Sequence, residues 1–188
     1  MKKSFFAIAA LVALTILTAE RAFAAPSDNA PDVSELLDAR QADVWVEGER
    51  LGDLVIGARG AIQMIYVDEQ LSRAITADSR LQDWVYDMAQ YYGTDATRKK
   101  RLFIAHIDVY KPWDFDYTQI FVGDYHLQKG DVLSPSMTNP FGPQPSKSDG
   151  FFAFVVPASA AKAGAEIKIG YEMIRRHGKY RNKGLAHI

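Results

Sequence analysis

The residues with the clearest chemical potential are His106 and Asp108, which lie two positions apart in a strongly β-forming segment. Side chains two positions apart in a strand project from the same face, and Tyr110 continues that face. A histidine beside a carboxylate can act as a general base, and the two can also begin a metal site. Because Leu102 and Ile104 share this face, the sequence favours a half-buried His–Asp pair with a structural role over a catalytic one.

The segment KPWDFDY, which follows directly, alternates aromatic and acidic residues. Aromatic faces stack on pyranose rings while carboxylates accept hydrogen bonds from sugar hydroxyls, and aromatic anchors also suit protein partners. We therefore predict a binding surface made of Trp113, Asp114, Phe115, Asp116 and Tyr117. The alternative is that Trp113 or Phe115 folds back and closes the end of a β-sandwich. Two acids alone do not predict calcium, since the other ligands of an EF-hand loop are missing.

Other motifs for catalysis or cofactor binding are absent from the sequence. It contains no G-x-S-x-G, S-x-x-K, H-E-x-x-H or P-loop pattern. The absence of cysteine excludes thiol catalysis, cysteine-based metal sites and disulfides. Only four histidines are present, which argues against a multi-histidine metal centre. We expect no cofactor and no bound metal, and the net charge of −1 indicates no nucleic-acid partner.

Residues 1–24 have the pattern of a cleavable secretory signal. Two lysines precede a long apolar run, and an Ala-Phe-Ala triplet of the kind that signal peptidases recognise ends the segment. We expect cleavage between Ala24 and Ala25, which places the mature chain 25–188 in the periplasm or outside the cell. The apolar run is shorter than the roughly 20 residues of a membrane helix, so we expect no membrane span in the mature form.

Periodicity predicts two helices and seven strands. The better helix covers 78–92, because its apolar residues follow one stripe and Ser79 and Gln82 match a capping box. A shorter helix is expected over 32–40. The expected strands are 43–49, 54–56, 61–67, 102–110, 117–125, 151–156 and 165–173. We expect a hairpin between the fourth and fifth of these strands, and the apolar sixth strand as a central strand paired with the seventh.

These elements predict a β-rich fold. It is either an immunoglobulin-like β-sandwich or a small α+β fold with the helix 78–92 packed on an antiparallel sheet. We expect one globular domain over 25–188, with a disordered leader at 25–31 and a disordered tail at 178–188. The proline-rich stretch 134–150 is expected to be a functional or mobile loop.

The leading functional hypothesis is an exported, non-catalytic binding domain of the bacterial cell envelope. Its partner would be an envelope protein or a glycan, bound through the 111–117 turn, the 134–150 loop, or both. One alternative is a small hydrolase or metal-dependent enzyme that uses His106 and Asp108. Another is a carbohydrate-binding module that uses the turn at Trp113.

Overall fold

The computed structural model of the protein describes residues 32–135, 139–162, 164–175 and 178–187. The predicted signal segment 1–24, its cleavage site between Ala24 and Ala25, and the leader 25–31 lie outside them. The described chain is rich in strands, and its strand pairings are antiparallel. The prediction of a β-rich or small α+β fold is therefore confirmed.

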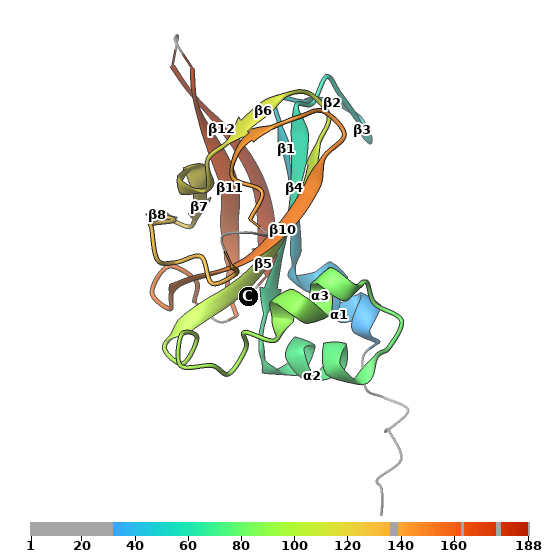
Figure 1. Cartoon of the computed structure of the whole chain (residues 1–188), viewed down its shortest axis with the longest axis vertical. Helices are drawn as coiled ribbons and strands as arrows, with labels where there is room; N and C mark the ends of the chain where they lie inside the picture. Colours follow the sequence, from blue (N-terminus) through green and yellow to red (C-terminus); the bar gives the residue numbers. More distant parts are fainter. Residues whose placement is uncertain (1–31, 136–138, 163, 176–177, 188) are drawn as a thin grey trace, which may run out of the picture. The chain divides into compact units, whose positions relative to one another are not determined.

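The first sheet has four strands in the order β1-β4-β5-β10 (Figure 1). They are β1 Gln41–Val46, β4 Gly60–Val67, β5 Lys100–Val109 and β10 Asp149–Pro157. Strand β1 alternates as its sequence predicts, with Val44 and Val46 buried and Trp45 on the opposite face. Strands β4 and β5 are buried on both faces over much of their length because they lie between two layers, which explains their apolar runs.

Strand β10 lies at the edge of this sheet, so the prediction of a central strand is wrong. Its apolar residues are nevertheless buried, because helices cover one of its faces and the second sheet covers the other. The segment before it also covers part of the free edge. The backbone N–H of Leu133 donates to the Ala153 carbonyl at 2.8 Å. The N–H of Val155 donates to the Asp131 carbonyl at 2.9 Å. This cover allows an apolar strand to end a sheet.

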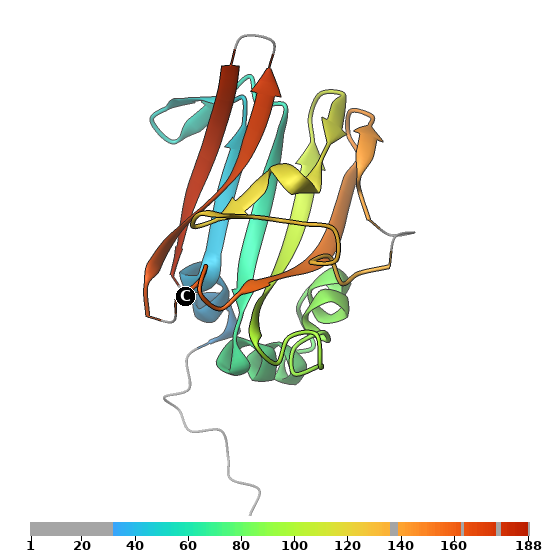
Figure 2. The same ribbon diagram turned by 90° about the vertical axis from the view of Figure 1, so that its left-hand side faces the viewer.

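The second sheet has the order β12-β11-β7-β8 and packs against one face of the first (Figures 1 and 2). Its strands are β7 Ile120–Val122, β8 Tyr125–His126, β11 Glu166–Arg175 and β12 Gly178–His187. Strand β11 pairs with β7 and β12, so the predicted pairing of 165–173 with 151–156 is wrong.

The prediction of a disordered tail over 178–188 is also wrong for residues 178–187. These residues form β12, which pairs with the full length of β11. Their sequence is polar and contains two glycines, so it shows little propensity to form a strand. The strand forms because its backbone hydrogen-bonds to a hairpin partner. Within β11, the charged side chain of Glu172 is buried and pairs with His126 at 3.1 Å.

The predicted hairpin between 102–110 and 117–125 does not form, because both edges of β5 are already taken by β4 and β10. The chain after β5 instead forms β6 Trp113–Phe115, the 3-10 helix η1 Tyr117–Gln119, and then β7. Strand β6 pairs with β9 Gly142–Gln144, a short strand inside the stretch 134–150 that was expected to be irregular. A separate hairpin, β2 Glu49–Leu51 and β3 Leu54–Ile56, connects β1 to β4.

Three short helices cover one end of the opposite face of the first sheet, which we call the outer face (Figure 1). They are α1 Val33–Arg40, α2 Glu69–Ala77 and α3 Asp83–Ala89. The predicted single helix 78–92 is therefore wrong in its bounds, and α2 was not predicted. The capping box at Ser79 does not form, since α3 begins after Gln82. None of the helices in the described part of the chain has the length and apolar character needed to span a bilayer.

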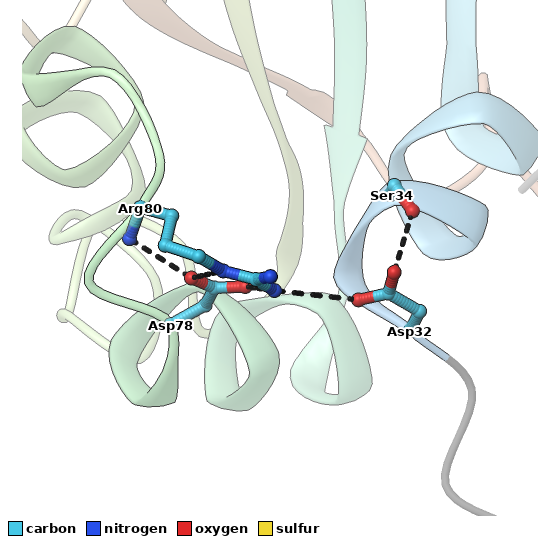
Figure 3. Close-up of polar contacts among 4 residues, drawn as sticks. All are labelled: Asp32, Ser34, Asp78 and Arg80. Atoms are coloured by element: carbon cyan, nitrogen blue, oxygen red, sulfur yellow. Dashed lines mark hydrogen bonds and ion pairs between the residues drawn. The ribbon is translucent and has the colours of Figure 1, made fainter.

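Asp78 ends α2 and organises the connection to α3 (Figure 3). Its carboxylate accepts hydrogen bonds from the backbone N–H and the guanidinium of Arg80, the shortest at 2.6 Å. These bonds lower the pKa of Asp78 to about 2. Arg80 also lies 3.8 Å from the carboxylate of Asp32, which in turn accepts a hydrogen bond from Ser34 (Figure 3). This exposed network connects the start of α1 to the α2–α3 turn.

Candidate binding surface

The helices cover only half of the outer face of the first sheet. Under them, the face is apolar and includes Ile65, Leu102 and Ile104. Beyond them, the strands continue with polar and aromatic side chains. We call this region the outer patch and define it by Asp43, Trp45, Gln63, His106, Asp108, Tyr110 and Asp149, together with Phe151, which stacks on Trp84 of α3 at the border with the helices.

Strand register brings these side chains together from four strands. Directly opposite residues of antiparallel strands share a face and lie close to one another. One row runs from Asp43 through Gln63 and His106 to Phe151. The next row runs from Trp45 through Ala61 and Asp108 to Asp149. The patch is thus a continuous surface built by residues far apart in the sequence.

His106 lies where the patch meets the helices. Its ring stacks on Trp84 of α3, with ring centroids 5.4 Å apart and planes 23° apart. Its Nε2 is 3.5 Å from Asp149, at the limit of hydrogen-bond distance, and its side chain is 21% exposed. The sequence predicted a partnership with Asp108. The carboxylate that His106 contacts in the structure is that of Asp149, on the neighbouring strand.

Trp45 and Tyr110 form the aromatic part of the patch. Their rings stack with centroids 6.2 Å apart, and the two residues remain 37% and 45% exposed. Ala61 lies between Trp45 and Asp108 in the row that crosses β4, and its small side chain leaves the space above the sheet to the larger rings. An exposed, stacked pair of large aromatic residues is the kind of anchor that binding surfaces use.

The patch carries three carboxylates, of which Asp43 accepts a hydrogen bond from Gln41 at 3.0 Å and Asp149 lies 3.5 Å from His106. Among the described residues, the side chain of Asp108 has no hydrogen bond or ion pair. Two basic residues of the adjoining segments are engaged elsewhere: Lys111 donates to the Gly57 carbonyl at 2.6 Å, and Arg59 pairs with Glu47 at 2.9 Å. Burial raises the pKa of Tyr110, and the charges of Asp108 and Asp43 raise it further. The tyrosine hydroxyl therefore lies in a negative environment.

The β2–β3 hairpin adds an apolar margin to this end of the sheet. It follows the end of β1 at Val46 and leads into β4, and in Figure 1 it lies on the same side of the sheet as the helices. Its side chains Leu51, Leu54 and Ile56 are all more than half exposed. Exposed aliphatic residues next to exposed aromatic rings indicate a surface that contacts another molecule.

The binding surface predicted at 111–117 does not form, because its two central aromatic rings lie in the core. Trp113 and Phe115 are buried between the sheets, where both rings pack on Tyr171. Gly60 makes room for the indole, since a Cβ at that position would lie 2.9 Å from its ring. Neither ring is therefore available to stack on a sugar, and the carbohydrate hypothesis loses the aromatic surface that it requires at this turn. The alternative stated for this segment, aromatic rings folded into the core, describes the observed arrangement.

The remaining residues of that segment have local partners. Asp116 caps η1, accepting hydrogen bonds from the backbone N–H and the hydroxyl of Thr118 at 2.9 and 2.7 Å. Burial raises the pKa of Asp116, but these hydrogen bonds outweigh burial and hold it below its ordinary value. Tyr117 packs against Phe141, and Asp114 is exposed. Within the described residues, no group of three or more histidine, aspartate or glutamate side chains is placed to hold a metal ion.

Sequence reasoning placed His106, Asp108 and Tyr110 on one face but did not connect the other residues of the patch with them. Trp45 carried a usable signal, because a tryptophan alternating with buried valines must lie on the opposite face of its strand. Asp149 carried none, since only the pairing of β10 with β5 brings it to His106. No family model, curated protein or solved structure matches this chain.

Proposed function

We propose that the protein is an exported, non-catalytic binding domain of the cell envelope, and that the outer patch is its binding surface. The observation that carries this proposal is the exposed stack of Trp45 and Tyr110 on a sheet face whose other half is covered by helices. A sheet face that remains uncovered, aromatic and acidic is suited to a partner molecule.

The chemistry around His106 supports binding rather than catalysis. Stacking on Trp84 and contact with Asp149 hold the imidazole in place. Catalysis by a histidine needs a nucleophile or substrate atom within hydrogen-bond reach of a free ring nitrogen. Among the described residues, the polar contact of the His106 ring is with the Asp149 carboxylate and no hydroxyl group lies within hydrogen-bond distance of it, which suits a residue that shapes the surface.

The composition of the surface favours a protein partner with basic residues. Three carboxylates attract lysine and arginine, and the rings of Trp45 and Tyr110 can also receive such cations through cation–π contacts. The aliphatic side chains of the β2–β3 hairpin extend the surface in a way that suits a protein more than a sugar. We propose an envelope protein that presents basic side chains.

The experiment is capture from envelope extract on the immobilised mature chain. Trp45→Ala and Asp108→Asn should each weaken capture of the same partner by at least about tenfold, since central aromatic and charged groups dominate interfaces. Asp95→Asn and Asp114→Asn are matched controls that remove an exposed charge outside the patch. Capture should also weaken with added salt.

Two results would contradict the proposal. Capture that survives both patch variants would remove the patch as the binding surface. If Asp114→Asn abolished capture of the partner and Asp108→Asn did not, the binding surface would be the 111–117 turn and not the outer patch. Retention on purified peptidoglycan instead of protein would favour the glycan alternative.

A further inference from the structure

A separate cavity of about 270 Å³ lies at the end of β4 and the beginning of β5, where the connection from α3 crosses the sheet. Its lining is basic and aromatic: Tyr66, Tyr92, Arg98, Lys100 and Arg101 supply the polar groups, and no acidic residue lines it. The basic run 98–101 stands out in the sequence, and the outer patch makes no use of it.

The three cations of this cavity are only partly neutralised. Among the described residues, Arg101 has no ion pair with a carboxylate, and its Nε donates to the Ala161 carbonyl at 3.2 Å. Lys100 is 3.4 Å from Asp131. Arg98 pairs with Asp95 at 2.9 Å, but both side chains are highly exposed and such pairs are weak. The lining therefore keeps positive charge available for a ligand.

The tyrosines complete the lining. The side chain of Tyr66 is buried, and burial raises the pKa of its hydroxyl while the charge of Arg101 lowers it, which places the two groups near each other. Tyr92 is partly exposed at the other side of the cavity. Two further acids whose charges act on these tyrosines, Asp68 and Glu69, are paired with Arg40 and Arg73. They do not satisfy the cations of the cavity.

We propose that this cavity binds a small organic phosphate. A guanidinium presents donors that match phosphate oxygens, and an ammonium group adds charge at the same point. A phosphate monoester carries about −1.5 to −2 charges, which suits Arg101 and the weakly paired Arg98 better than the single charge of a carboxylate does. The ring of Tyr92, which is 37% exposed, offers apolar surface to the organic part. The site is independent of the outer patch.

Calorimetry on the mature chain at constant ionic strength tests the site with phenyl phosphate, inorganic phosphate and benzoate. Phenyl phosphate should bind most tightly and benzoate least. Arg101→Gln should weaken phenyl phosphate binding by at least about tenfold, because it removes charged hydrogen bonds. Lys99→Gln is the matched control. It changes the same charge in the same run, but Lys99 does not line the cavity.

Arg101 also contacts Tyr66, so circular dichroism should accompany its substitution. If Arg101→Gln does not fold, Arg98→Gln is the second variant, because Arg98 is exposed and its substitution leaves the packing intact. Weaker binding in Arg98→Gln than in Lys99→Gln supports the site. Three results would overturn it: no binding of phenyl phosphate to the wild type, equal affinity for benzoate, or equal weakening by the Lys99 and arginine substitutions.

Discussion

Two tryptophan-centred clusters lie on opposite faces of the first sheet. Trp113 packs with Phe115 and Tyr171 between the two sheets and is 4% exposed. Trp45 stacks on Tyr110 on the outer face and is 37% exposed. Both clusters combine aromatic rings with nearby aspartates, so residue composition does not separate them.

The difference lies in what covers each face. The second sheet closes the inner face completely around Trp113, whereas the helices stop before they reach Trp45. An aromatic–acidic segment is therefore evidence for a binding site only when the surrounding layers leave it uncovered. The segment 111–117 shows how the same composition serves packing.

The largest expected effect separates the two tryptophans directly. Trp113→Ala should lower the free energy of unfolding by about 3–5 kcal/mol, because it empties space in the core. Trp45→Ala is the matched substitution and should cost about 1 kcal/mol or less. Urea denaturation followed by circular dichroism measures both. Equal losses would mean that the outer cluster is as much a part of the core as the inner one.

A second comparison uses the tyrosines of the two clusters at alkaline pH. Burial raises the pKa of Tyr171 to about 12, from an ordinary value of 10.0. Between these values the unfolded chain loses this proton while the folded chain keeps it. The free energy of unfolding should therefore fall by about 1.4 kcal/mol per pH unit from this group as pH rises.

Between pH 10 and 12, Tyr171→Phe should remove this contribution to the slope of the unfolding free energy against pH. Denaturation at several pH values measures the slope. Tyr110→Phe is the control and should change the slope less, because Tyr110 is 45% exposed. Tyr125, whose pKa burial and Asp131 raise to about 12, leaves a residual slope in both variants. A Tyr110 effect as large as that of Tyr171 would contradict the comparison.

The smallest expected effect concerns the aspartates of the buried segment. Asp116→Ala should lower the free energy of unfolding by about 1 kcal/mol, because it removes the cap of η1. Asp114→Ala, two residues away and exposed, should change it by less than about 0.5 kcal/mol. Thermal denaturation compares the pair. If Asp114 proved the costlier position, the structural role assigned to Asp116 would be wrong.

The sequence was informative wherever one strand or helix could be judged alone. Alternation predicted the faces of Val44, Trp45 and Val46, and the spacing of His106 and Asp108 placed them correctly on one face. The helix over 32–40 also formed, within one residue of its predicted start. Periodicity did not predict α2, because this short helix depends for its stability on contacts with the sheet through Leu71 and Ile75.

The same reasoning could not predict which strands pair with each other. The partners of β5, β10 and β11 were assigned to neighbours in the sequence, but the structure joins β5 to β4 and β11 to β7. Register between distant strands depends on which apolar faces meet after collapse, and one sequence contains no direct record of it. Asp149 reached His106 only through such a pairing.

The sequence by itself therefore determined the class of fold, the alternation within its strands and the absence of cysteine chemistry. These properties follow from side-chain period and residue type, which are local. Tertiary structure alone decided that Trp113 is core, that Trp45 is surface and that Arg101 lines a cavity. Burial is a property of the layers that surround a residue, and those layers come from segments distant in the chain.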